Sequence, residues 1–150
     1  GAALHGNFGV VKFISTLPGV DPTARNNYAI RWSAICGHLD IVKFLVTLPG
    51  VDPTVWDNHA IRRAASNRHF DVVLELMHHI QDIPLEVITP ELESLVFKRA
   101  CELARIDLPA ELCWLIGECI WGSSSGIYFG EEKRRKALTK IRILKRLSLI

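Results

Sequence analysis

The stretch LPGVDPT occurs twice without change, at residues 17–23 and again 31 residues later at 48–54. Its Pro-Gly pair ends a helix, because proline cannot continue one and glycine adopts the left-handed conformation that closes it. Its Asp-Pro-Thr end carries side chains that form turns. The stretch therefore marks the junction between successive copies of one structural unit.

Other landmarks repeat at the same shift, so the period of the unit is 31 residues. A third copy is weaker, because HIQDI at 79–83 replaces the turn. A fixed period of this length indicates a repeat array in which neighbouring units share one continuous core. The landmarks are Gly6 with Gly37, VKF at 11–13 with VKF at 42–44, NYAIR at 27–31 with NHAIR at 58–62, and HLDIV at 38–42 with HFDVV at 69–73.

Each unit contains two short helical patterns. The first is predicted at about residues 28–36 and ends at Gly37, and the second is predicted at about 39–48. Two helices of about ten residues cannot close a core alone, so the sequence predicts an all-α solenoid of stacked helical hairpins. The residues expected on the two buried stripes are Ile30, Ser33 and Ala34, then Ile41, Val42, Leu45 and Leu48.

The segment AICGHLDIVKFL at 34–45 resembles the ankyrin repeat pattern A-A-x-x-G-H-x-x-x-V-x-x-L-L. Residues 64–76 repeat it with Arg68 in place of the glycine, and the resemblance covers about residues 2–80. The family's T-P-L-H, whose Thr and His cap and bridge repeats, is replaced by YAIR and HAIR at 28–31 and 59–62. Because the period is also two residues short of the usual 33, we expect a trimmed loop without a full β-hairpin finger.

The chain is expected to have four parts. The ankyrin-like repeats fill residues 1–87, with a truncated first unit, and a divergent helical hairpin at 88–122 caps them. The capping hairpin starts with Thr89-Pro90-Glu91, which has an N-cap residue, a first-turn proline and an acid at the helix start. A Ser/Gly connector at 123–130 leads to a basic amphipathic helix at 131–150.

The composition excludes several classes of protein. The chain has 150 residues, is 49% apolar and carries a net charge of +2, which is typical of a globular protein and not of a disordered one. Its apolar runs are shorter than the roughly 18 residues that a membrane span needs. The four cysteines form no Cys-x-x-Cys pair, so we expect reduced thiols in an intracellular, cytoplasmic protein. KRRK at 133–136 leaves a nuclear location open.

A second function is suggested by residues 106–120. LPAEL at 108–112, followed by Ile116 and Ile120, is similar to the opening of an F-box, L-P-x-E-L-x-x-x-I-x-x-x-L. That resemblance implies a substrate-recognition adaptor of a cullin-type ubiquitin ligase. The later Cys-Lys-x-Trp region of an F-box is not found in residues 121–150, and an ordinary helix with a proline start explains the same residues.

The sequence predicts no chemistry of its own. It has no G-x-S-x-G and no Gly-rich phosphate loop, so we expect no catalytic residues, no cofactor and no small-molecule substrate. Glu75 and His78 form only one Glu-x-x-His, and His38 and His69 occupy a structural ankyrin position, so no metal site is expected. The basic helix lacks the aromatic side chains that nucleic-acid and membrane binding favour.

The ankyrin resemblance implies that a protein partner binds the loops between units and the concave side of each first helix. Trp56 stands out, because an aromatic residue in a turn has little local core to enter, and Trp and Arg are enriched at interface hot spots. In a second interpretation, Trp32 and Trp56 simply pack on each other across neighbouring units. The expected contact residues are Arg25, Asn27, Arg31, Trp32, Ile35, Cys36, Val55, Trp56, Asn58, Arg62, Arg63, Ser66 and Asn67.

Overall fold

The computed structural model describes residues 1–93, 95–96 and 131–146. The chain forms two compact units, Gly1–Val87 and Ile88–Ile150, which are described separately here. Every regular element in the described residues is a helix, which confirms the all-α prediction. The described loops between successive repeats contain no β-hairpin, as the short period predicts.

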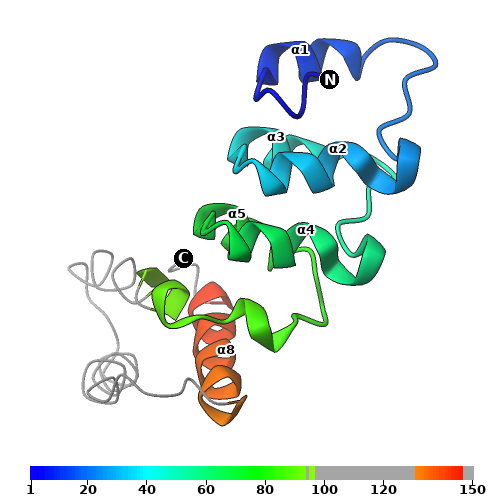
Figure 1. Cartoon of the computed structure of the whole chain (residues 1–150). Coiled ribbons are helices and arrows are strands. Elements are labelled where there is room, and N and C mark those ends of the chain that lie inside the picture. The colour runs from blue at the N-terminus through cyan, green and yellow to red at the C-terminus, as the bar shows by residue number, and fades with distance from the viewer. Residues whose placement is uncertain (94, 97–130, 147–150) are drawn as a thin grey trace. The chain divides into compact units, whose positions relative to one another are not determined.

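Gly1–Val87 consists of helices that stack as successive layers (Figure 1). The helices α2 (Ala24–Ile35) and α3 (Leu39–Leu45) form one pair, and α4 (Val55–Ser66) and α5 (Phe70–Leu76) form the next. The helix α1 (Phe8–Ile14) packs on α3, and the 3-10 helix η1 (Leu85–Val87) packs on α4. We call α2 and α4 the first helices and α1, α3 and α5 the second helices. Within each class the bounds differ by 31 residues, so the structure keeps the period of the sequence.

The predicted stripes form the core. Ile30, Ser33 and Ala34 are fully buried on α2, and the Ser33 hydroxyl donates to the carbonyl of Ala29 at 2.8 Å. On α3, Ile41, Val42 and Leu45 are buried, and each such aliphatic side chain contributes about 1.5–3 kcal/mol. Leu48 is only half-buried, because α3 ends at Leu45 and residues 46–50 form turns. The second helix is therefore shorter than predicted.

The repeated LPGVDPT turn is closed by the same hydrogen bonds in both copies. The Asp21 carboxylate accepts from the backbone N–H of Thr23 at 2.8 Å and from its hydroxyl at 2.6 Å. Asp52 and Thr54 repeat this geometry at the same distances. These donors stabilise the charged carboxylate and lower the pKa of Asp21. The turn chemistry read from the sequence is therefore present in the fold.

A glycine of one unit packs against a histidine of the next. Gly37 has a φ of +77°, and a Cβ on it would lie 2.5 Å from the His69 ring of the next unit. Gly6 has the same relation to His38, whose Nε2 also lies 3.0 Å from the carbonyl oxygen of Leu4. The family's Gly-His pair thus acts between neighbouring units, with each histidine filling the space that the preceding glycine leaves open.

The second unit is described only in part. Residues 90–93 and 95–96 are helical, as the Thr-Pro-Glu start predicts. The predicted basic helix is present as α8 (Glu131–Arg146), in which Ala137, Leu138, Ile141 and Leu144 are buried. Three predicted parts lie outside the described residues. They are the rest of the predicted hairpin, the F-box-like segment at 106–120 and the connector at 123–130. None of the described helices has the length and apolar character needed to cross a membrane.

Candidate partner-binding surface

Each first helix begins with a left-handed turn, and this turn shapes the candidate surface. Arg25, Asn26 and Asn27 have φ values of 54–55°, and the equivalent residues 56–58 have values of 55–58°. Residues other than glycine lose about 1–2 kcal/mol each in this conformation. The surrounding structure must therefore hold the turn in place, and regular helix follows it from residue 28 or 59.

Arg31 holds the turn of α2. Its Nε donates to the carbonyl of Asn26 at 2.9 Å, and its Nη2 donates to the carbonyl of Arg25 at 3.2 Å. The side chain is almost fully buried, with 4% of the residue exposed. Arg31 stands where the ankyrin T-P-L-H has its histidine, so an arginine here replaces that histidine as the residue that braces the start of the first helix.

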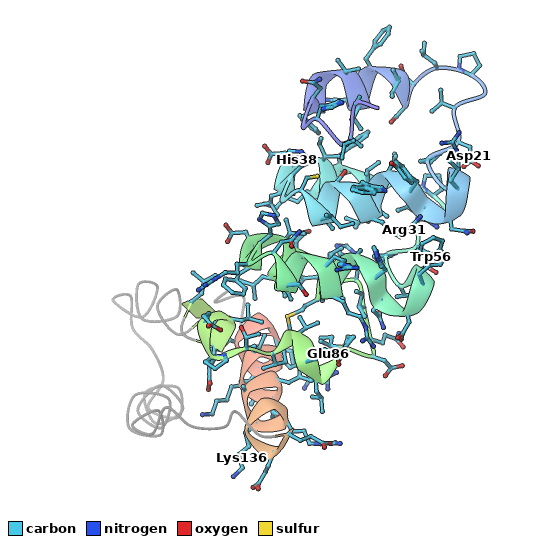
Figure 2. All side chains as sticks on the ribbon, in the orientation of Figure 1. Asp21, Arg31, His38, Trp56, Glu86 and Lys136 are labelled. Atoms are coloured by element: carbon cyan, nitrogen blue, oxygen red, sulfur yellow. The ribbon has the colours of Figure 1, made fainter. Side chains whose placement is uncertain are left out.

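Trp56 of the next unit covers Arg31. The guanidinium carbon lies 3.9 Å from the centre of the indole ring, within the range of a cation–π interaction (Figure 2). The ring also meets that of His59 edge-on, with centroids 6.0 Å apart. Trp56 nevertheless remains 60% exposed. A large indole is thus fixed by neighbours on one side while most of its surface faces solvent.

Trp32 has a different neighbour. Its ring packs against that of Tyr28, with centroids 5.6 Å apart, and Trp32 itself is half-buried. Among the ring contacts of the described residues, Trp32 and Trp56 do not meet, so the interpretation in which the two indoles stack on each other is wrong. The reason is that the Arg31 guanidinium occupies the face of Trp56 that points toward α2.

The two equivalent asparagines of the turns differ in their partners. Asn27 is buried, and its Oδ1 accepts the backbone N–H of Asp52 at 3.0 Å, which ties α2 to the following turn. Asn58 has a buried Oδ1 without a partner, and the third turn that follows it lacks the Asp-Pro-Thr sequence of the first two. Asn27 therefore serves the stack and offers little to a partner protein.

The remaining arginines lie at the edge of the surface. Arg62 pairs with Asp57, at 2.9 Å between Nη2 and Oδ2, and also with Glu86. Arg25 and Arg63 are exposed and have no carboxylate partner within the part of the chain that the structure describes. Pairs at exposed positions contribute little stability, so Arg62 is held only weakly.

His59 lies between these charges. Burial lowers the pKa of its imidazole below the usual 6.5, and the positive charges of Arg31 and Arg63 lower it further. His59 and Tyr28, which flank Arg31 and Trp56, belong to the candidate surface and were not predicted from the sequence. The signal for them was their shared place directly after the asparagine of each turn.

The other predicted residues lie at the far ends of the first helices, about 12 Å along the helix axis from the left-handed turns. Ile35 and Cys36 are half-buried, and the side-chain amide of Asn67 donates to the carbonyl of Ile35 at 2.8 Å. Ser66 is exposed and donates to the carbonyl of Arg62. Only Val55, half-buried at the start of α4, stays beside the turn group. The predicted set therefore divides into two separate groups.

The described residues contain no group of three or more His, Cys, Asp or Glu side chains that could hold a metal ion. What they contain is an exposed indole, several guanidinium groups and an imidazole whose pKa is lowered. Such a set can recognise another molecule by stacking and by charged hydrogen bonds.

Comparison with known proteins identifies the repeats. A family model of ankyrin repeats, in three copies, matches residues 1–86, which is more than half of the chain. Searches of curated proteins and of solved structures return no match. The matched residues include both first helices, the left-handed turns and the glycine–histidine contacts described above. The chain therefore belongs to the ankyrin repeat family.

Proposed function

We propose that residues 1–87 form a non-catalytic module that binds a partner protein along the first helices, with Trp56 at the centre of the contact. Ankyrin repeat domains are typically protein-binding modules and usually have no catalytic role. The observation that carries the proposal is the exposure of an indole whose ring is already fixed by Arg31. A side chain that is ordered before binding loses little conformational entropy on binding.

The position of Trp56 supports this choice over other exposed apolar residues. Phe8, Val10, Phe13, Leu17 and Val20 are also exposed, but they lie on α1 and in the turn after it. Their exposure reflects their place in the first unit. Val10 is 50% exposed there, whereas Ile41, the equivalent residue of the next unit, is 1% exposed. Among the described residues, Trp56 is the large apolar side chain that stays exposed beyond residue 20.

The test compares two exposed aromatic residues. A partner captured with the full chain is purified, and its affinity is measured by calorimetry for the wild type, Trp56→Ala and Phe13→Ala. We expect Trp56→Ala to weaken binding by more than about 1 kcal/mol, or about fivefold. Phe13→Ala, on a second helix, should stay within about twofold. Equal effects of the two substitutions would contradict the proposal.

A further inference from the structure

The charges of the repeats are separated between the two classes of helix. The first helices α2 and α4 contact each other and carry four arginines but one acid, Asp57. The second helices α1, α3 and α5 together carry three acids and two lysines, Lys12 and Lys43. Residues 1–87 as a whole contain seven Lys or Arg and eight Asp or Glu. The repeats are therefore close to neutral, and their positive charge is concentrated on the first helices.

Several of these positive charges have no carboxylate beside them. Arg25 and Arg63 are exposed and unpaired within the described residues, and Arg31 uses its donors on two backbone carbonyls. Arg62 differs, because Asp57 and Glu86 both pair with it. Three guanidinium charges on the first helices are thus left without an internal counter-charge.

Arg31 and Trp56 link these charges through direct contacts. Arg31 touches the backbone of Arg25 through Nη2 and lies under the ring of Trp56. Trp56 meets His59, and Arg63 follows His59 by four residues on α4, so these two side chains lie on the same face of that helix. Along with burial, the positive charges of Arg31 and Arg63 both lower the pKa of His59, in keeping with this arrangement. We call the residues Arg25, Arg31, Trp56, His59 and Arg63 the basic strip.

We propose that the basic strip binds an acidic segment of a partner protein, with carboxylates at Arg25 and Arg63 and an apolar or aromatic side chain on Trp56. This inference rests on the proposed function and adds the chemistry of the partner. The guanidinium fork matches a carboxylate with two parallel hydrogen bonds. Charge complementarity of this kind selects partners and accelerates their encounter.

A nucleic acid fits the strip less well than a peptide. A phosphate backbone carries closely spaced negative charges and needs a run of cations along its path. Here Asp57 and Glu86 interrupt the positive charge beside Arg62, with 80% and 52% of their side chains exposed. A peptide can place its few carboxylates where the arginines are unpaired and avoid these two acids.

The test begins with a library of short random peptides displayed on phage. The library is selected against the immobilised full chain and, in parallel, against Trp56→Ala. We expect the peptides that require Trp56 to be rich in Asp and Glu. A synthetic peptide from this set should lose about tenfold or more in affinity when its acids are changed to Asn and Gln.

Two charge-reversed variants then locate the contact. Arg63→Glu should weaken the synthetic peptide by about tenfold, whereas Lys43→Glu, the same charge change on an exposed lysine of α3, should stay within about twofold. Equal effects of the two variants would overturn the inference. It would also be overturned if a single-stranded oligonucleotide displaced the peptide more efficiently than the free peptide does.

The outcomes distinguish a failure of the acidic-partner inference from a failure of the proposed binding function. Selection of neutral or basic peptides that still require Trp56 would leave the binding module in place and overturn the acidic partner. Failure to select any peptide that requires Trp56 would count against both. Selection of acidic peptides whose binding is unchanged by Arg63→Glu would show that the acid is read elsewhere and would overturn the basic strip.

Discussion

The guanidinium carbon of Arg31 lies 3.9 Å from the ring centre of Trp56, so a side chain of one first helix contacts the turn that begins the next. The same guanidinium donates to the carbonyls of Arg25 and Asn26 in its own unit. Arg31 therefore braces one left-handed turn and supports the indole of the next. The exposed surface of Trp56 depends on a residue that is itself buried.

This double role predicts unequal costs for two equivalent substitutions. Arg31→Met removes two hydrogen bonds from a charged donor and the cation–π contact, so we expect unfolding to become easier by about 2–4 kcal/mol. Arg62→Met, 31 residues later, removes only exposed ion pairs and should cost less than about 1 kcal/mol. Urea unfolding of the full chain measures both, and equal losses would contradict the bracing role.

The two turn asparagines form a second matched pair. Asn27→Ala removes the side-chain acceptor of the Asp52 N–H from a partly buried hydrogen bond, which we expect to cost about 0.5–1.5 kcal/mol. Asn58→Ala removes an oxygen that already has no partner. Both positions have nearly the same left-handed φ, so that contribution cancels in the comparison. Urea midpoints should place Asn58→Ala closer to the wild type, and the reverse order would show that the Asn27 bond is not a stabilising link.

The helices and their buried stripes could be predicted because they follow from period and apolar spacing. The left-handed turns could not. Arg25 and Trp56 have no preference for positive φ, and only the Asn and Asp residues that follow them hint at it. One support of the turn in α2 comes from the following turn, whose Asp52 N–H donates to Asn27, whereas Asn58 keeps the same backbone conformation without such a donor. Local sequence does not report a contact made 25 residues away.

The role of Arg31 could not be predicted from the sequence, for a related reason. A charged residue in place of the ankyrin histidine predicts an exposed contact, since arginine is rarely buried without partners. The left-handed turn leaves two carbonyls within reach of the guanidinium, and they provide those partners. By contrast, the exposure of Trp56 was predictable, because its turn has no local core, while its seat on Arg31 required the stacked structure.

The environment of His59 predicts a pH dependence of stability. Its pKa in the folded chain is below 6.5, through burial and through Arg31 and Arg63, so the unfolded chain binds the proton more readily. The free energy of unfolding is therefore highest, as far as His59 is concerned, above pH 6.5. It falls as the pH drops toward the pKa of His59 in the folded chain, and below that pKa it falls no further. His59→Gln should flatten this part of the curve.

The control for this prediction is His5→Gln, which changes an exposed histidine of the first unit. Unfolding by urea is measured at a series of pH values from neutral to mildly acidic for the wild type and both variants. We expect the His59 variant to lose less stability on acidification than the other two proteins. If all three curves run parallel, neither burial nor the guanidinium groups lower the pKa of His59 in the folded chain.

The glycine–histidine contact accounts for the replacement of glycine by Arg68 in the third copy. Gly37 has positive φ and faces the ring of His69, so the position needs both a left-handed backbone and an empty side. Arg68 occupies the third equivalent position, with a φ of 64°. The residue 31 positions after His69 is Ala100, so no histidine of a further regular unit needs the space. Residue 68 therefore does not need to lack a side chain, although its backbone keeps the left-handed conformation.

This difference predicts opposite signs for two substitutions. Gly37→Ala adds a Cβ 2.5 Å from the His69 ring on a left-handed residue, and we expect it to destabilise the repeats by about 2–4 kcal/mol. Arg68→Gly relieves a left-handed residue that has no such neighbour and should stabilise by up to about 1 kcal/mol. Thermal unfolding of the two variants measures both effects. A loss of stability in Arg68→Gly comparable to that in Gly37→Ala would mean that the Arg68 side chain packs in a way that its exposed position does not indicate, because the backbone change alone favours glycine.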